Sequence, residues 1–236
     1  MFSLPVALHI PDGLLSSGVA AVLWVVAIAA VSLGLRVANR DLDEARVPLL
    51  GVLAAFIFAV QMLNFPVAGG TSGHLLGATL AAVLLGPWIA CLVMAVVLVT
   101  QAFGFADGGV SALGANIVNM GVLGALLAGF LVTVGEKALP KSRSAFLGVV
   151  GVVSWLAVMV GAAATSVQLA ISGIVPLDTV LPAMLGVHAL IGIGEAVITV
   201  AAVGAVLTAR PDLITLVRFK PSPVGPAAAA AARGAS

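Results

Sequence analysis

Long apolar stretches separated by short polar or glycine-proline breaks run through almost the whole of this 236-residue chain. Seven such stretches can be marked, and they cover residues 14–35, 47–64, 73–86, 88–103, 111–134, 145–172 and 178–208. A helix needs about 20 apolar residues to cross the hydrocarbon core of a bilayer. The pattern therefore predicts an all-α integral membrane protein, built as a bundle of about seven transmembrane helices.

The third stretch is short, and a single kinked helix over 73–103 is the alternative, which would leave six spans. The distribution of basic residues separates the two possibilities, because basic residues gather on the cytoplasmic side of a membrane. The lysines and arginines form three groups, which are Arg36, Arg40 and Arg46; Lys137, Lys141 and Arg143; and Arg210, Arg218, Lys220 and Arg233. Seven spans place all three groups on one side, so we expect the amino terminus outside and the carboxyl terminus in the cytoplasm.

This topology divides the chain into three parts. Residues 1–13 form an outer amino-terminal segment that carries a histidine, residues 14–208 form the membrane domain, and residues 209–236 form a cytoplasmic tail. The tail is rich in proline and alanine from Pro221 onward, a composition typical of disorder. We therefore expect the tail to be disordered.

Composition supports the membrane assignment and excludes several functions. The chain is 62% hydrophobic and only 8% charged, whereas soluble domains carry about 25% charged residues. Its net charge of +1 gives no electrostatic footprint for nucleic acid. The sequence has no G-x-x-x-x-G-K-[ST] phosphate loop and no metalloprotease or serine-hydrolase motif, so we expect no enzyme and no ATPase of its own. The single cysteine, Cys91, is interpreted as a small buried apolar residue.

A few polar side chains need a separate explanation, because such groups are costly in hydrocarbon unless they are paired, hydrated or functional. Six of them fall near the outer ends of their elements under the seven-span topology: His9, Asn64, His74, Gln101, Asn116 and Asn119. Imidazole is the commonest transition-metal ligand, and amides can orient such a ligand by hydrogen bonds to its other ring nitrogen. The sequence indicates an outward-facing metal site with two histidine ligands, although either histidine taken alone is more often an ordinary interfacial residue.

Two further polar groups lie in the last stretch. His188 and Glu195 are seven residues apart and so share one helix face. A hydrogen-bonded structural role within the bundle and a role in transport are equally compatible with this spacing. Gln168, near the end of the sixth stretch, is interpreted as a residue that joins two helices.

Several collinear motifs over residues 8–208 resemble the CbiM/NikM family, the substrate-capture (S) components of energy-coupling-factor (ECF) transporters for cobalt and nickel. They are HIPDGLLS at 9–16, QMLNFPVAGGTSGHLLG at 61–77, LGPW at 85–88, FADGG at 105–109, LGANIVNM at 113–120 and VHALIGIGE at 187–195. The family has seven spans and an external amino terminus. The resemblance therefore implies the same topology as the distribution of basic residues.

The resemblance also implies a ligand set. Chains of the family begin Met-His and hold the metal through the terminal amine, the next main-chain nitrogen, the imidazole of the second residue and a distant histidine. Carried over by motif, His9 is the second-residue histidine and His74 the distant one, while the main-chain nitrogen of Leu8 takes part if Leu8 is the true first residue. The implied substrate is Co²⁺ or Ni²⁺, with no organic cofactor.

The sequence departs from the family at its start, because Met1 to Ala7 precede the expected first residue. A free amine at position 8 then requires either translation from the Leu8 codon or proteolytic removal of the extension. A start at position 8 is the interpretation we favour.

What the resemblance implies about function is an ATP-driven importer that feeds cobalamin or nickel-enzyme synthesis. Its expected partners are a membrane coupling (T) subunit, two cytoplasmic ATPase subunits and a small additional membrane subunit, in the cytoplasmic (inner) membrane of a bacterium or archaeon. A stand-alone cation channel or secondary carrier, with His188 and Glu195 on its ion path, is the alternative. A membrane scaffold without a substrate is a third possibility.

Overall fold

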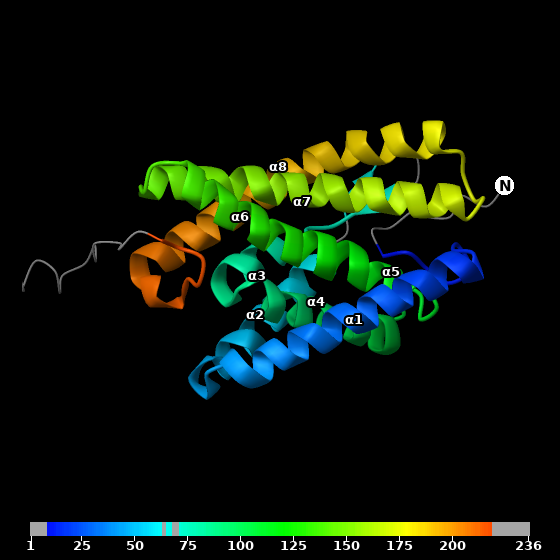
Figure 1. Ribbon diagram of the computed structural model, residues 1–236. Coiled ribbons are helices and arrows are strands. Elements are labelled where there is room, and N and C mark those ends of the chain that lie inside the picture. Colours follow the sequence, from blue (N-terminus) through cyan, green and yellow to red (C-terminus); the bar gives the residue numbers. More distant parts are fainter. Residues whose placement is uncertain (1–8, 63–64, 68–70, 219–236) are drawn as a thin grey trace, which may run out of the picture.

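The computed structural model describes residues 9–62, 65–67 and 71–218 and is a bundle of helices (Figure 1). The helices are α1 (Ser17–Asp41), α2 (Val47–Gln61), α3 (Ala78–Leu85), α4 (Pro87–Phe105), α5 (Leu113–Ile117), η2 (Val118–Leu126), α6 (Leu127–Ala138), α7 (Arg143–Ile171) and α8 (Leu177–Ala209). Two short 3₁₀ helices, η1 (Glu44–Arg46) and η3 (Pro211–Leu213), lie before α2 and after α8. A two-stranded antiparallel hairpin pairs β1 (Phe65–Val67) with β2 (Thr71–Gly73).

Six helices of the described chain are long and apolar enough to cross a membrane. They are α1, the η1–α2 unit, α4, α7, α8 and the continuous helix formed by α5, η2 and α6. The predicted all-α membrane bundle is therefore confirmed. The side of the membrane on which each terminus lies stays a prediction.

Local sequence signals set where the helices begin. The Ser142 hydroxyl accepts a hydrogen bond from the Ala145 amide at 3.2 Å and caps α7. Pro87 opens α4, where its missing N–H costs nothing, and Gly86 before it has a φ of +82°, a left-handed value that glycine adopts without strain. The break at these two residues means that 73–103 is not one kinked helix.

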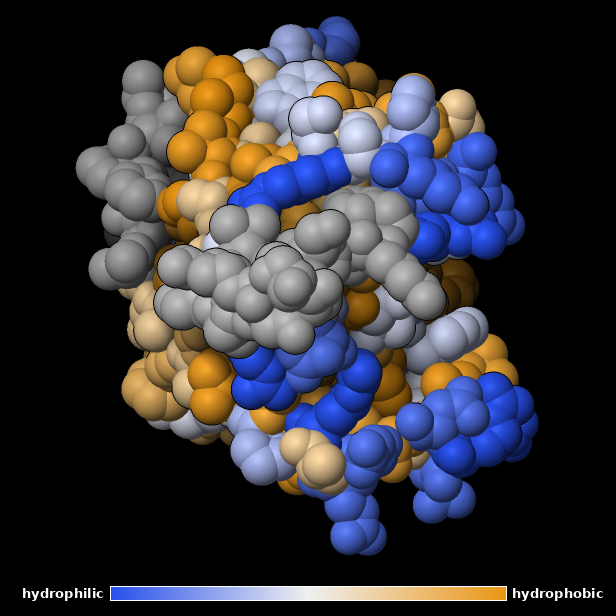
Figure 2. All heavy atoms as spheres, turned by 90° about the vertical axis from the view of Figure 1, so that its left-hand side faces the viewer, coloured by the Kyte–Doolittle hydropathy of each residue, from blue (hydrophilic) through white to orange (hydrophobic). Residues whose placement is uncertain are grey.

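The described members of the three basic groups lie at one end of the bundle. The Arg46 guanidinium donates to the Thr215 hydroxyl at 3.1 Å, and the Arg143 guanidinium donates to the Gly204 carbonyl at 3.0 Å. The last described residues lie at this end of the bundle, on the left of Figure 1. The first described residues lie toward the opposite end, on the right. Figure 2, a view onto the left-hand end, shows hydrophilic residues gathered on that face. We call this the basic end, and the opposite one the histidine end.

The third predicted span crosses the bundle in an unusual way. Helix α3 has eight residues and so a length of roughly 12 Å, less than half of a bilayer core. The non-helical residues 71–77 precede it, of which 71–73 form β2, and His74 among them contacts His9 at the histidine end. At the basic end, the Leu84 carbonyl accepts a hydrogen bond from the Thr215 hydroxyl at 2.7 Å. The segment 71–85 is thus a seventh crossing that is half extended and half helical.

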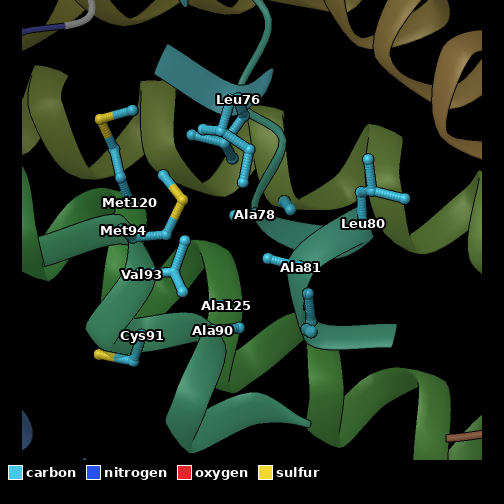
Figure 3. Close-up of a cluster of buried hydrophobic side chains, with 14 of the residues drawn as sticks. Leu76, Ala78, Leu80, Ala81, Ala90, Cys91, Val93, Met94, Met120 and Ala125 are labelled. Carbon is cyan, nitrogen blue, oxygen red and sulfur yellow. The ribbon is translucent and has the colours of Figure 1, made fainter. Parts of the chain in front are cut away.

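This crossing lies in the centre of the protein. Every residue of α3 is buried, and the helix is surrounded by α4, η2, α6, α7 and α8. Figure 3 shows the apolar side chains at this point, where Leu76, Ala78, Leu80 and Ala81 meet residues of α4 and η2. Cys91 of α4 is among them and fully buried, as its sequence context predicted. The non-helical residues 74–76 before α3 are buried too, and burial in protein is the condition under which non-helical chain is tolerated at membrane depth.

The chain after α8 differs from the expected disordered tail over residues 210–218. The amides of Thr215 and Leu216 donate to the Val83 carbonyl at 3.1 and 3.2 Å, and the Arg218 amide donates to the Glu136 carboxylate at 3.4 Å. The last carbonyls of a helix have no hydrogen-bond donor within that helix. The chain that returns after α8 therefore supplies donors to the carbonyl end of α3. Residues 219–236 of the predicted tail lie outside the described residues.

The junction between the extended and helical halves of the crossing gives a stability prediction. Gly77 has a φ of +73°, and a Cβ atom there would lie 2.9 Å from Ile57 of α2. We expect Gly77→Ala to destabilise the protein by at least about 1 kcal/mol, because a left-handed backbone is strained for alanine and the side chain of Ile57 must move. Thermal unfolding in detergent would measure the change.

Gly51→Ala is the matched control. An added Cβ at this position in the middle of α2 meets nothing within 4 Å, and alanine is the better helix former. Its melting temperature should equal or exceed that of the unmodified protein. Equal melting temperatures for the Gly77→Ala protein and the parent would contradict the prediction.

Candidate functional site

The two histidines singled out in the sequence meet at the histidine end of the bundle. The rings of His9 and His74 lie with their centroids 4.6 Å apart and their planes tilted by 42°. Both side chains are buried, with at most 2% of their surface exposed. The Nε2 atoms of both rings have no hydrogen-bond partner among the described residues. Two segments that are distant in sequence therefore bring a pair of unsatisfied imidazole nitrogens together.

A carboxylate lies beside the first histidine. The Asp107 Oδ1 atom is 3.0 Å from the His9 Nδ1 atom, although the direction falls short of a well-formed hydrogen bond. Burial acts to raise the pKa of Asp107, but the neighbouring His9 and His74 outweigh it and the pKa is lowered. The site thus contains one anionic oxygen next to two imidazoles.

Asn116 of α5 positions the backbone that carries His9. Its Oδ1 atom accepts from the Ile10 amide at 2.8 Å, and its Nδ2 atom donates to the Ile10 carbonyl at 3.1 Å. The amide of Gly109 donates to the same carbonyl at 2.9 Å. These bonds satisfy the buried backbone next to His9 as a strand partner would.

Asp12 closes the same segment onto the loop before α5. Its carboxylate accepts from the Ser111 hydroxyl at 2.6 Å, the Ser111 amide at 2.7 Å and the Val110 amide at 3.2 Å. The Ser111 hydrogen bonds lower the pKa of Asp12. Gly109 passes so close to Pro11 and Asp12 that a Cβ there would collide with their backbone, which explains the glycine pair in the FADGG segment.

The backbone that carries His74 is held by side chains from two other helices. Both carboxylate oxygens of Glu195 accept backbone bonds at 2.8 Å, one from the Leu76 amide and the other from the Gly77 amide. The Gln61 amide donates to the Leu76 carbonyl at 2.8 Å, and Gln101 in turn donates to Gln61 at 3.0 Å. These contacts replace the hydrogen bonds that a helix would supply, and a backbone in hydrocarbon requires such replacement.

The ring of His74 has a defined orientation. Its Nδ1 atom lies 2.9 Å from the Leu75 carbonyl, which only accepts, so Nδ1 carries the proton and Nε2 keeps a lone pair. A neutral imidazole whose Nδ1 proton is held by a backbone carbonyl, which leaves Nε2 free, is the usual form of a metal-ligating histidine.

The remaining predicted site residues are placed differently. The Asn119 amide, three residues from Asn116, is not bonded near the histidines: it exchanges hydrogen bonds of 2.9 and 2.6 Å with Gln168 and donates to Thr165 at 3.1 Å. The helix-joining role predicted for Gln168 is therefore seen here. Asn116 belongs to α5 and Asn119 to η2, where the wider π-helical turn rotates it toward α7.

His188 and Glu195 share a buried face of α8, as their spacing predicted. They are not bonded to each other: the His188 Nδ1 atom lies 2.7 Å from the Met184 carbonyl, and Glu195 holds the Leu76–Gly77 backbone. Leu8 and Asn64 lie outside the described residues. Within the described ranges, no group of three His, Cys, Asp or Glu side chains is arranged to hold a metal ion, so a complete site needs main-chain nitrogens or residues from beyond them.

Sequence reasoning missed the contributions of Asp12, Gln61 and Asp107. For Asp107 a signal was present, because a carboxylate between glycines in a predicted outer loop lies on the same side as the two histidines. Nothing in the sequence indicated that Asp12 would bond Ser111, about a hundred residues away. Such pairings depend on how α5 lies against the amino-terminal segment.

Comparison with known proteins gives concordant matches. Residues 9–213 match the family described as "Cobalt uptake substrate-specific transmembrane region". A putative fused nickel transport protein NikMN of Archaeoglobus fulgidus is 38% identical over 88% of this chain and 68% of its own length. A putative metal transport protein of Haloquadratum walsbyi is 37% identical over 93% and 98%. The crystal structure of a truncated transition metal transporter superposes with a TM-score of 0.74 at 32% identity, covering 84% of this chain and 98% of that one.

The Asn116 contact can be tested by amide hydrogen exchange. We expect Asn116→Ala to speed exchange in the peptide containing Ile10 about tenfold, because a lost hydrogen bond of about 1.4 kcal/mol corresponds to that factor. Mass spectrometry of the exchanged protein in detergent would measure it. Asn119→Ala, which removes a buried amide on the same helix, should leave this peptide unchanged, and equal acceleration by both variants would contradict the assignment.

Proposed function

Because the chain belongs to the cobalt-uptake substrate-specific transmembrane family, and is thus a multi-pass cobalt/nickel transport component, we propose that it captures Co²⁺ or Ni²⁺ at His9 and His74 for ATP-driven import. The observation that carries the proposal is the buried Nε2 atom of His74, which has no hydrogen-bond partner in the described chain and belongs to a ring whose centroid lies 4.6 Å from that of His9. A buried polar atom left unpaired costs about 1–3 kcal/mol. Coordination of a divalent ion that prefers nitrogen would remove this cost.

The proposed ligand set combines imidazoles with main-chain nitrogen. A chelate that joins the main-chain nitrogen of His9 to its own ring uses Nδ1, the ring nitrogen nearer to the backbone, and so releases the contact with Asp107. The carboxylate of Asp107 then stays beside the ion as a compensating charge. With the amine of Leu8 as first residue and with His74, the ion has four nitrogens, an arrangement that suits Ni²⁺.

The proposed energy source is ATP hydrolysed by two cytoplasmic subunits, coupled through a membrane T subunit and a small additional membrane subunit. The family resemblance supports this part of the proposal, which includes a position in the cytoplasmic (inner) membrane of a bacterium or archaeon. The described basic residues at one end of the bundle support a cytoplasmic position for that end, with the histidine pair facing outward.

The channel or carrier alternative needs a mobile ion ligand in the middle of a span. Glu195 was the candidate for that role. Both of its carboxylate oxygens are held by backbone amides, so its release would leave two buried N–H groups unsatisfied, at a cost of about 1–3 kcal/mol each. This cost argues against Glu195 as an ion relay.

Metal content tests the capture site. We expect the protein purified from its native host to retain about one Ni²⁺ or Co²⁺ per chain, and His74→Ala to retain none, because one imidazole of the proposed ligand set is lost. Mass spectrometry of the metals would measure both. Ser154→Ala is the control, since this buried hydroxyl bonds only the Val150 carbonyl of its own helix. Metal retained undiminished by the His74→Ala protein would refute the proposed site.

Uptake measurements test the energy source. We expect cells that contain the chain together with its proposed partners to accumulate radiolabelled nickel or cobalt, and to stop when the two ATPase subunits are deleted. A protonophore that leaves cellular ATP intact should reduce the initial rate by less than twofold. Full uptake without the ATPase subunits would favour the channel or carrier instead.

A further inference from the structure

A groove with entirely apolar walls runs along the outer surface of α6 and α7, which lie side by side (Figure 1). Its volume is about 450 Å³, and every residue that lines it is leucine, valine, alanine or glycine. Three of these residues, Val134, Leu139 and Val152, have exposed side chains. The groove therefore opens sideways, onto the surface that a bilayer covers.

Two glycines create the space between the helices. At Gly135 of α6, an added Cβ atom would lie 2.7 Å from the side chain of Val149, so glycine is what lets α6 approach α7 there. At Gly148 of α7, an added Cβ atom would meet nothing within 4 Å. Both glycines line the groove. Gly148 thus leaves open space beside a close helix contact, and a larger side chain at this position would fill it.

The length of the groove matches one leaflet of a bilayer. The groove extends from Leu139 and Ala145, beside the connection between the helices, to Leu131 and Leu156. The separation of Ala145 and Leu156 corresponds to roughly 16 Å along the axis of α7, and half of the hydrocarbon core of a bilayer is roughly 15 Å thick. A transmembrane helix of another subunit would need a groove about twice as long, whereas one acyl chain of a lipid fits this length.

Positive charge borders the groove at the basic end. Leu139, which lines the groove, has Lys137 and Lys141 on either side of it in the sequence. Both lysines are exposed, and neither forms an ion pair with any of the described residues. Arg143 is different, because its guanidinium donates hydrogen bonds to α8. The two lysines are therefore the cationic groups that remain available at the mouth of the groove.

No acidic residue of the connection opposes these lysines. Residues 137–143 contain neither aspartate nor glutamate. Glu136, which precedes them, is buried and accepts a hydrogen bond from the Arg218 amide. The mouth of the groove is thus complementary to an anion, while its walls are complementary to a hydrocarbon chain.

We propose that this groove binds an anionic phospholipid of the cytoplasmic leaflet, with one acyl chain between α6 and α7 and the phosphate group at Lys137 and Lys141. Anionic headgroups of that leaflet attract basic residues at the membrane surface, and burial of the acyl chain in the groove removes apolar surface from solvent. The proposal uses the cytoplasmic position of the basic end and is independent of metal capture. The lipid would fill the space that Gly148 leaves open.

Native mass spectrometry of the protein in detergent tests this site by titration with dioleoyl phosphatidylglycerol and dioleoyl phosphatidylcholine, which have the same acyl chains. We expect the parent to bind phosphatidylglycerol at least about fivefold more tightly, because two lysines face its net negative charge. Lys137→Gln/Lys141→Gln should bind both lipids equally. Gly148→Phe should bind phosphatidylglycerol at least about fivefold more weakly than the parent, because the ring occupies the place of the acyl chain.

Two control variants match these changes elsewhere in the bundle. Gly51→Phe adds the same ring at another helix position where a Cβ atom meets nothing within 4 Å. Arg36→Gln/Arg40→Gln removes two exposed basic residues of α1 near the same end. Both should bind phosphatidylglycerol within twofold of the parent. Equal binding of the two lipids by the parent, or an affinity of Gly148→Phe within twofold of the parent, would overturn the proposal.

The complete transporter decides between a lipid and a partner subunit in this groove. A phosphatidylglycerol with a photoreactive diazirine in its acyl chain should label residues 131–156 in membranes that contain the assembled transporter. Absence of label there would mean that a partner subunit covers the groove, and would overturn the proposal. His74→Ala should be labelled like the parent, so a failure of the metal site and a failure of the lipid site give different results.

Discussion

The carboxylate of Glu195 accepts hydrogen bonds from two successive backbone amides, those of Leu76 and Gly77, inside a largely apolar bundle. A membrane interior offers no water to backbone groups, so a non-helical segment survives there only if protein satisfies them. Glu195 from α8 and Gln61 from α2 do so together. The extended half of the crossing, the position of His74 and the contact between α8 and the crossing all depend on this arrangement.

This arrangement connects the histidine end of the protein to the basic end through one short segment. His74 stands near one end of the crossing, and the Val83 and Leu84 carbonyls at the other end hold the chain that returns after α8. Helix α3 between them is fully buried and closely packed.

The amino-terminal segment joins the site by a different physical principle. Its described residues, 9–13, form no helix, and their order comes from Asn116, Asp12 and the glycine pair at 108–109. These contacts hold the backbone on the carboxyl-terminal side of His9 and so fix the position of His9. Main-chain positioning suits a site in which, as we propose, main-chain nitrogen itself binds the metal.

The residues of the site differ in how well the sequence alone predicted them. His9 and His74 could be selected from sequence because imidazoles are rare in so apolar a chain and because both belong to extended motifs of a family. Asn116 was selected together with Asn119, and the α-helical period wrongly suggested a shared environment, since the π-helical turns of η2 send Asn119 to α7. Gln101 was selected as a neighbour of the site, but its contact with the site is indirect. It donates a hydrogen bond to Gln61, which in turn donates to the Leu76 carbonyl.

The sequence by itself determined the membrane bundle, the breaks at Gly86 and Pro87 and the gathering of basic residues at one end, because hydropathy, backbone restrictions and charge act locally along the chain. Only the tertiary structure decided that the third crossing is half extended, and that Glu195 supports it instead of pairing with His188. It alone brought His9, His74 and Asp107 together. Hydrogen bonds between residues about a hundred positions apart, such as that between Leu76 and Glu195, leave no periodic signal in a single sequence, so only the packed arrangement of the helices reveals them.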